Sequence, residues 1–504
     1  MTIMMASMQQ AVAFYDHLTH HIVPGPQTIS YLVPLVLLPT ALLIPRSTLS
    51  RCQNILLFMP IITACIVHAC WAMGGVDVIS VDVLLWSLLL LVLQDPWKDF
   101  RWVVRKDNGQ KFKRSDTQIS ASNPGRTLPK AQQAIKEVST SERTALLQPA
   151  NSGEATEATQ AKNKPHSHVH QHISKHTYPE SFYERLQWVG TLLVSIRLNN
   201  WKISTPSHDR KQPPTPAFQD RLSFVLYTLF CFMRGYFVLD LTRAYISYDP
   251  YFTDPHIPVR SPLPYGDVDG LPAQFVRAMV TGAQAWALIS QMFYLPCLLP
   301  VGLHALGLLS DEWSPHLWPS YFGSPEAIFL HGVRGFWGKY WHQTMRWSVA
   351  GPGYAVADAL QLKAGGVVRY SLITLVAFGL SGTVHMGLVP PQPLHATVSA
   401  NVIRLYVAGF FWTQPIAMLV ETLGAKIMSC VTGLSFWQKG AGRLIRLLVN
   451  GMWVLMWFTF TMSLLSEAGK QMGYWRVWTV PSSIWQGLRG EGWVAWPVLN
   501  DLRS

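Results

Sequence analysis

Long apolar runs separated by short connections constrain this chain more than any other feature. A helix that crosses a bilayer needs about 20 mostly apolar residues, because each residue advances about 1.5 Å through hydrocarbon about 30 Å thick. The run at 275–309 is long enough for one tilted helix, or for two short helices broken at Pro296 and Pro300. We predict an all-α polytopic integral membrane protein with about eight transmembrane helices, at residues 29–44, 55–73, 78–93, 222–241, 275–309, 370–388, 402–423 and 444–466.

The composition agrees with this class and excludes others. Hydrophobic residues make up 49% of the 504 residues and charged residues only 13%, whereas an average soluble domain is about a quarter charged. Many of the 21 Trp flank the apolar runs, where an amphipathic ring favours the membrane interface. These features exclude a soluble enzyme, a secreted disulfide scaffold and a disordered regulator. The six cysteines lie in or beside apolar runs without a C-x-x-C pair, which predicts reduced thiols.

The basic balance of the chain does not predict a nucleic-acid partner. The net charge is +12, but cytosolic loops of membrane proteins collect Lys and Arg, and the apolar runs make the lipid bilayer the expected partner. The N-terminus has no basic region followed by an early cleavage site. We therefore expect the first apolar run to remain as a membrane anchor.

Changes in composition divide the chain into four predicted parts. Residues 1–94 hold the first three transmembrane helices, and residues 95–220 form a polar, basic loop that we expect to be cytosolic and partly disordered. Within that loop, residues 182–200 resemble an amphipathic segment on the membrane surface. Residues 221–475 form the catalytic transmembrane region, and residues 476–504 form a tail.

An ionisable residue inside a membrane span is costly and therefore a candidate for function. His385 is the titratable side chain of the run SLITLVAFGLSGTVHMGLVP, and the small residues before it would let a neighbouring helix or a ligand approach closely. A neutral imidazole there could take a proton from a hydroxyl. Alternatively, His385 is a structural histidine bonded to a backbone carbonyl.

A second candidate is the aromatic and polar segment FWGKYWHQTMR at residues 336–346. As a helix it would place Trp337 and Trp341 on one face, and His342 and Arg346 likewise share a face. The segment is either an active-site helix for the acyl donor near the cytosolic interface or an interfacial aromatic belt with snorkelling cations.

These two segments in this order resemble the membrane-bound O-acyltransferases, in the wax-synthase-like branch that includes fungal terpenoid and meroterpenoid acetyltransferases. The segment FFWTQPIAMLVE at residues 410–421 adds to the resemblance, which covers roughly residues 220–475. Many relatives carry an Arg-Gly-x-Gly-Trp element before the central spans, whereas this chain has IRLNNW at residues 196–201.

The resemblance implies a role for each matching residue. His385 would be the catalytic base, and His342 would be its polar partner in the aromatic motif. Trp337, Trp341, Gln343 and Arg346 would bind substrate, with Arg346 contacting a CoA phosphate. A donor near His342 or Gln343 would stabilise the oxyanion of the tetrahedral intermediate.

Other motifs give weaker predictions. A His-rich tract in the polar loop is either a weak metal site or a low-complexity segment; it comprises His166, His168, His170, His172 and His176. At or after the end of a span, Asp240, Arg243, Asp249 and Asp254 resemble an interfacial charge cluster, but we expect them to lie in a solvated loop. The sequence has neither a P-loop nor an H-E-x-x-H motif, so ATP-driven transport and zinc proteolysis have no support.

Taken with the resemblance, the sequence predicts an enzyme of the endoplasmic reticulum membrane. It would move an acetyl group from acetyl-CoA to a hydroxyl of a hydrophobic, terpenoid-like acceptor in secondary metabolism. We expect no metal and no bound cofactor, with acetyl-CoA as co-substrate. The alternatives are a wax synthase that uses long-chain acyl-CoA and a fatty alcohol, and a polytopic transporter of a lipophilic metabolite.

Overall fold

A computed structural model describes residues 26–72, 75–106, 172–195, 201–203, 220–309, 320–393, 396–432, 440–477 and 479–495, together with 198, 218, 313–315 and 318. The chain divides into one compact unit of residues 1–104 and 175–504 and a second of residues 105–174. Almost all of the second unit lies outside the described residues, and so do the predicted disordered segment and His166, His168 and His170.

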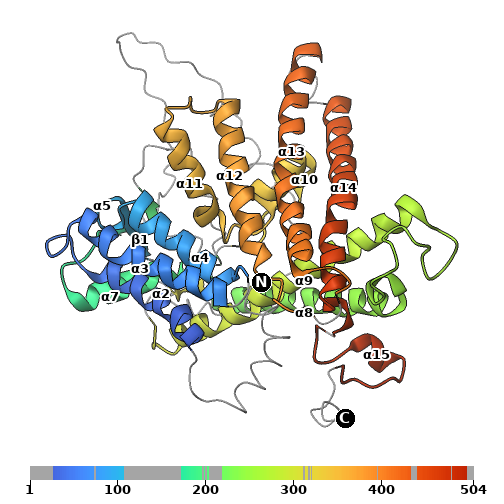
Figure 1. The fold of residues 1–504 in the computed structure, drawn as a ribbon, viewed down its shortest axis with the longest axis horizontal. Coiled ribbons are helices and arrows are strands. Elements are labelled where there is room, and N and C mark those ends of the chain that lie inside the picture. Colours follow the sequence, from blue (N-terminus) through green and yellow to red (C-terminus); the bar gives the residue numbers. More distant parts are fainter. Residues whose placement is uncertain are drawn as a thin grey trace, which may run out of the picture. The chain divides into compact units, whose positions relative to one another are not determined.

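The described chain is mainly helical, as the apolar runs predict (Figure 1). The helices of the first part are α2 (Pro26–Leu43), α3 (Arg51–Ala72), α4 (Val78–Ser87), η1 (Leu88–Leu93), α5 (Pro96–Asp99) and α7 (Phe182–Val194). Three short strands accompany them, β1 (Phe100–Lys106), β2 (His172–His176) and β3 (Trp201–Ile203). The helices that follow are α8 (Arg221–Tyr248), η2 (Pro250–Phe252), α9 (Gly270–Ala305), α10 (Glu326–Gly335), η5 (Phe336–Tyr340), α11 (Arg346–Ala359), α12 (Val367–Met386), α13 (Ala400–Thr432), α14 (Gly440–Gln471), η7 (Tyr474–Arg476) and α15 (Ile484–Leu488).

Six helices of the described residues are long and apolar enough to cross a membrane, and two shorter apolar helices cover residues 30–43 and 78–93. All eight predicted runs are therefore helical, and the protein is polytopic, but only six reach the length of a span. The run at 275–309 lies largely in one helix, α9, which contains Pro296 and Pro300 without ending at either.

The first part of the chain has its own hydrophobic core. Helix α2 packs against α3, and α7 packs against α2. Helix α7 buries Trp188 and Leu192 in this core, while Phe182 and Tyr183 on its other side are exposed. The helix is therefore amphipathic as predicted, and its place on a membrane surface stays a prediction. The all-α expectation misses one small feature: β1 pairs antiparallel with β3, which sets Trp102 opposite Trp201.

In the second part, α11, α12, α13 and α14 lie side by side in chain order, and α8 and α9 cross below them in the view of Figure 1. Helix α8 packs along α9, α11 along α12, α12 along α13, and α13 along α14, with α10 against both α13 and α14 (Figure 1). The core between α9, α10, α13 and α14 contains Val333, Phe410, Met418 and Phe458. These helices surround the short segment η5, which carries the aromatic motif.

The prediction of a solvated loop is wrong for three of the four charged residues. Asp240, Arg243 and Asp249 are buried, whereas Asp254 is exposed. Asp249 pairs with Arg277 of α9, whose Nε lies 2.7 Å from Asp249 Oδ2. Burial of these charges is possible because each has partners elsewhere in the chain, which a local pattern cannot show.

Candidate active site

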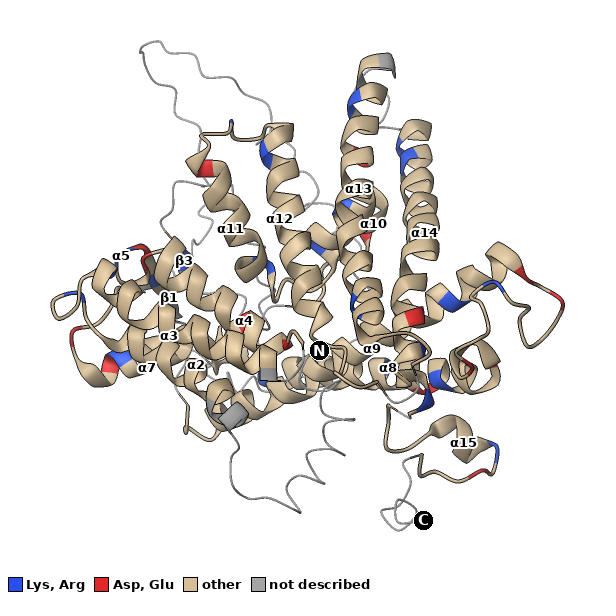
Figure 2. Ribbon diagram, in the orientation of Figure 1, with Lys and Arg blue, Asp and Glu red and all other residues tan. Residues whose placement is uncertain are grey.

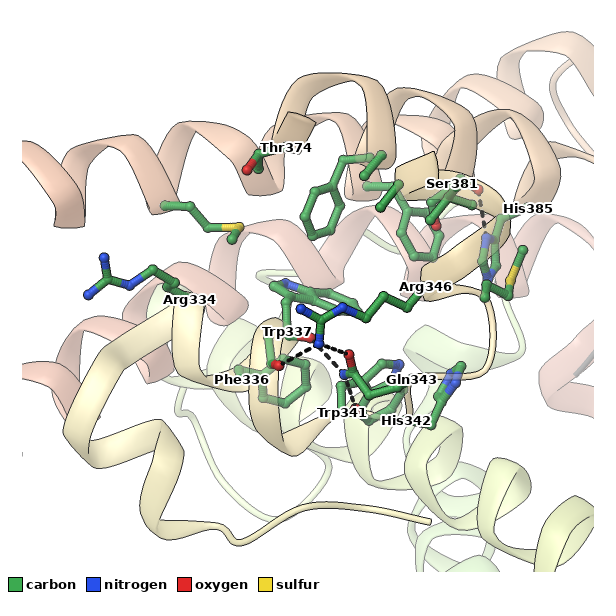
Figure 3. Close-up of a pocket in the computed structure, with 18 of the residues that line it drawn as sticks. Arg334, Phe336, Trp337, Trp341, His342, Gln343, Arg346, Thr374, Ser381 and His385 are labelled. Atoms are coloured by element: carbon green, nitrogen blue, oxygen red, sulfur yellow. Dashed lines mark hydrogen bonds between the residues drawn. The ribbon is translucent and has the colours of Figure 1, made fainter. Parts of the chain in front are cut away.

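A mostly apolar cavity of about 290 Å³ lies among α9, η5, α11, α12, α13 and α14. All six predicted site residues line it: Trp337, Trp341, His342, Gln343, Arg346 and His385. Figure 3 shows Arg334 and His385 at opposite ends of the drawn residues, with the side chains of the aromatic motif between them. The structure therefore brings the two predicted segments to one cavity; their catalytic roles stay predictions.

His385 lies in the last turn of α12, where two contacts fix its ring. Its Nδ1 lies 2.7 Å from the backbone oxygen of Ser381, and its ring stacks on Phe411 at 4.0 Å between centroids. A carbonyl oxygen accepts hydrogen bonds only, so Nδ1 carries the hydrogen and Nε2 keeps its lone pair. The carbonyl contact of a structural histidine is thus present, and it selects the tautomer that a base at Nε2 requires.

The small residues before His385 permit the close approach of α13. A Cβ on Gly382 would lie 2.5 Å from the indole Nε1 of Trp412, so a larger residue would push α12 and α13 apart. That indole nitrogen donates to the backbone oxygen of Gly379 at 3.2 Å. The predicted approach of a neighbouring helix is confirmed at this position.

The prediction of one helix over residues 336–346 is wrong beyond Tyr340. The segment η5 is a π-helix, and Trp341 is extended, with ψ 150°. The amide nitrogen of Gln343 donates to the backbone oxygens of Trp337 at 3.0 Å and Trp341 at 2.6 Å. The side chain thus replaces helix hydrogen bonds, and the helical alignment of His342 with Arg346 is lost.

These contacts narrow the roles of the polar residues in the motif. Both amide hydrogens of Gln343 are used on backbone oxygens, so its side chain shapes the segment in this structure. Arg346 donates to Gln343 Oε1 at 3.0 Å and to the backbone oxygen of Gly338 at 3.4 Å. His342 stacks on Tyr321, with an interplanar angle of 4°.

The Gln-Pro segment holds the wall of the cavity through Gln414. This side chain is 0% exposed, and its Oε1 accepts from the indole nitrogens of Trp337 and Trp457, each at 3.1 Å. Its amide nitrogen donates to the backbone oxygen of Phe410 at 2.7 Å. One amide therefore joins η5, α13 and α14 beside the ring of Phe411 that contacts His385.

The closing Glu421 of the same segment holds a kink in α10. Its carboxylate oxygens accept from the backbone nitrogens of Val333 at 2.6 Å and Arg334 at 2.9 Å. At the kink, Gly332 has φ 65° and ψ −143°, and a Cβ there would lie 2.2 Å from Glu421 Oε1. Gly332 is thus required both by its backbone angles and by the approach of the carboxylate.

The sequence reasoning did not single out several residues that line the cavity. A helical period would have found those on α12, because residues three, four or seven apart share one helix face. The members of this face, which they share with His385, are Tyr370, Ile373, Thr374, Ala377, Phe378 and Ser381. Arg334 and Tyr354 also line the cavity, and no local pattern marks them.

Residues 318–404, which include the aromatic motif and His385, match the membrane bound O-acyl transferase family. The chain is also similar to fungal acetyltransferases. One from Arthrobotrys oligospora is 25% identical over 58% of this chain and 60% of its own length. The acetyltransferase eriL of Hericium erinaceus is 27% identical over 62% of this chain and 74% of its own length. The acetyltransferase ataH of Aspergillus terreus is 27% identical over 44% and 72%.

The match to the Arthrobotrys protein thus spans less than two thirds of that relative. No solved structure gives a significant match to this chain. The family match covers α10, η5, α11 and α12, which line much of the cavity, and the relatives are named as acetyltransferases. The part of the chain that carries the aromatic motif and His385 is thus similar to the membrane bound O-acyl transferase family.

Proposed function

We propose that the protein is a membrane O-acetyltransferase, which moves the acetyl group of acetyl-CoA to a hydroxyl of a hydrophobic acceptor such as a terpenoid alcohol in secondary metabolism. The observation that carries the proposal is His385, which lines the apolar cavity and whose Nδ1 donates to the backbone oxygen of Ser381, so that Nε2 keeps the lone pair that a base requires. Three fungal relatives that bear the name acetyltransferase support the choice of acyl group.

In the proposed reaction, Nε2 of His385 takes the proton of the acceptor hydroxyl as its oxygen attacks the thioester carbonyl. The tetrahedral intermediate collapses to the acetyl ester and the thiolate of CoA, which takes up the proton from His385. A thioester is already activated, so the chain needs no covalent intermediate. Of the two predicted oxyanion donors, Gln343 is already engaged, so the proposal keeps His342 for this role.

The names of the fungal relatives, which are all acetyltransferases, favour a small acyl group over the wax-synthase alternative. We also propose that the acceptor enters from the bilayer. We further propose that the protein resides in the endoplasmic reticulum, and fractionation of cells that express a tagged chain would test this location. The proposal includes no metal and no bound cofactor.

The test is release of CoA by microsomes that contain the protein, supplied with acetyl-CoA and a panel of terpenoid alcohols. His385→Ala should lower the rate about 10²–10⁴-fold, the usual contribution of a positioned base. His256→Ala is the matched control, because His256 lies in an exposed loop. Activity with long-chain acyl-CoA only would favour the wax synthase. No release from folded, membrane-inserted protein would favour transport.

A further inference from the structure

A group of cations surrounds His331, and one of them, Arg334, lines the cavity at the end away from His385 (Figure 3). The group consists of Arg334 of α10, Lys339 of η5 and Arg446 of α14, here called the cationic cluster. All three lie close enough to the imidazole of His331 to affect its titration.

Among the described residues, no member of the cationic cluster forms an ion pair. Glu421 lies close enough to Arg334 for their charges to interact, while both of its oxygens accept from backbone nitrogens of α10. The Nε of Arg446 is buried without a hydrogen-bond partner. Three cations beside this carboxylate still repel one another, so the arrangement is stabilised when a further anion binds.

The protonation of His331 agrees with an excess of positive charge in the cationic cluster. Burial, followed by the charges of Lys339, Arg334 and Arg446, lowers the pKa of the imidazole to about 4. The ring is therefore neutral near pH 7, and its Nε2 accepts from the ammonium of Lys339 at 3.1 Å. His331 holds Lys339 in the cluster without neutralising its charge.

We propose that the cationic cluster binds phosphate groups of the acyl donor, on the nucleotide side of CoA. This inference rests on the proposed function, because it assigns the donor's anionic end to the part of the cavity opposite the base. An arginine fork matches phosphate geometry, and charge-assisted hydrogen bonds to it are strong. Arg346 fits the role less well, since it already holds Gln343 and the backbone of Gly338.

Figure 2 shows Lys and Arg at one common end of α12, α13 and α14. Arg446 of the cluster lies in the second turn of α14, and Arg369 lies in the first turn of α12. A basic region of this kind attracts anionic solutes such as CoA. A phospholipid head group carries the same phosphate chemistry, but the shared cavity between Arg334 and His385 favours the donor.

The experiment measures binding of CoA to the purified full chain in nanodiscs of zwitterionic lipid, with 3′,5′-ADP as competitor. Arg334→Ala should raise the Kd for CoA about 10-fold or more, as expected for loss of a charged hydrogen bond. Lys339→Ala should raise the Kd for CoA less. Because Lys339 is exposed, this variant should fold, so it still tests the cationic cluster if Arg334→Ala does not fold. Arg369→Ala is the control. It also removes a cation, but Arg369 already forms an ion pair with Asp358 and should not be available to bind phosphate.

The outcomes separate the two proposals. Wild-type turnover with an unchanged Kd for CoA in Arg334→Ala and Lys339→Ala overturns the cationic cluster as the donor site and leaves the acetyltransferase standing. Absence of CoA binding by wild type overturns both. In a further arm, nanodiscs with phosphatidylserine replace the zwitterionic ones. If Arg334→Ala changes the lipid preference but not the affinity for CoA, the cluster is a head-group site and the inference is wrong.

Discussion

Two arginines of this protein, Arg277 and Arg334, lie in regions that differ in how completely their charged side chains are paired. Arg277 is 0% exposed, and its Nε and Nη2 donate to the two oxygens of Asp249 at 2.7 and 2.8 Å. Its other hydrogens reach the backbone oxygens of residues 259, 261 and 262. Arg334 is held through its backbone nitrogen, which donates to Glu421, and its side chain lines the cavity without a hydrogen bond to another described residue.

The difference indicates how to distinguish structural charge from charge that awaits a ligand. Around Arg277, every cation has a partner: Lys470 pairs with Glu467 at 2.8 Å and donates to the backbone oxygen of Ile257. The ring of Tyr251 lies against both Arg277 and Lys470. This network joins the loop after α8 to α9 and α14. A fully paired network stabilises the fold, whereas the cationic cluster is incomplete without an anion.

The largest effect should come from breaking the paired network. Arg277→Leu leaves the carboxylate of Asp249 buried without a counterion, which costs about 3–5 kcal/mol of folding free energy. The measurement is thermal unfolding of the purified protein in detergent. Arg334→Leu, at the cavity, should change the melting temperature little. Equal melting temperatures for Arg277→Leu and wild type would show that the paired network does not stabilise the fold.

A smaller loss should follow from Gln414→Leu, which tests the cavity wall. The change leaves the indole nitrogens of Trp337 and Trp457 without their partner, whereas the backbone oxygen of Phe410 still accepts from Thr413 Oγ1. Each buried unsatisfied group costs about 1–3 kcal/mol. Because Trp337 lines the cavity, kcat/KM for acetyl transfer should fall together with stability.

The matched control for Gln414→Leu is Thr422→Val on the same helix. The hydroxyl of Thr422 bonds only to the backbone oxygen of Met418 within α13, so its loss should change stability by at most about 0.5 kcal/mol. If both variants behave alike, the two indole contacts contribute nothing specific, and Gln414 is an ordinary buried residue.

Gly332→Ala should act on the cationic cluster through the backbone. The φ and ψ of Gly332 suit glycine almost alone, and an added Cβ meets Glu421, so we expect a cost of about 1–3 kcal/mol. Movement of Arg334 should raise the KM for acetyl-CoA more than it lowers kcat. Gly424→Ala on α13, where a Cβ would meet nothing within 4 Å, is the control. An unchanged KM in the folded variant would show that the kink does not position Arg334.

The same comparison explains how far the sequence could predict this molecule. Hydropathy alone marks all eight apolar helices, because burial in lipid imposes length and composition locally. His385 and the motif at 336–346 could be named because an imidazole in an apolar run and mixed aromatic and polar residues are locally unusual. The break after Tyr340 could not, since it depends on Gln343 bonding to the backbone of Trp337.

Partners distant in the sequence account for the other misses. Asp249 resembles a loop residue until Arg277 of the next helix packs against it. Likewise, Gln414 gains its function only when Trp337 and Trp457, on two other elements, donate to the same oxygen. The sequence displays each member of such a set, but three-dimensional packing decides which members meet, and hence which charges are paired and which remain available.

The smallest effect concerns His331, beside the cationic cluster. Its pKa is about 4 in the folded protein, below the ordinary value of about 6.5 that applies to the unfolded chain. Between these two values the unfolded chain binds a proton that the folded protein does not, so stability falls as the pH drops from about 6.5 to about 4. Because His331 is only half-buried, screening keeps this fall to a few degrees of melting temperature at most. His331→Gln should remove this part of the pH dependence, and bound CoA should weaken it in wild type by neutralising the neighbouring cations. A melting temperature equally sensitive to pH in wild type and His331→Gln would contradict the assignment, because the proton uptake would then belong to another group.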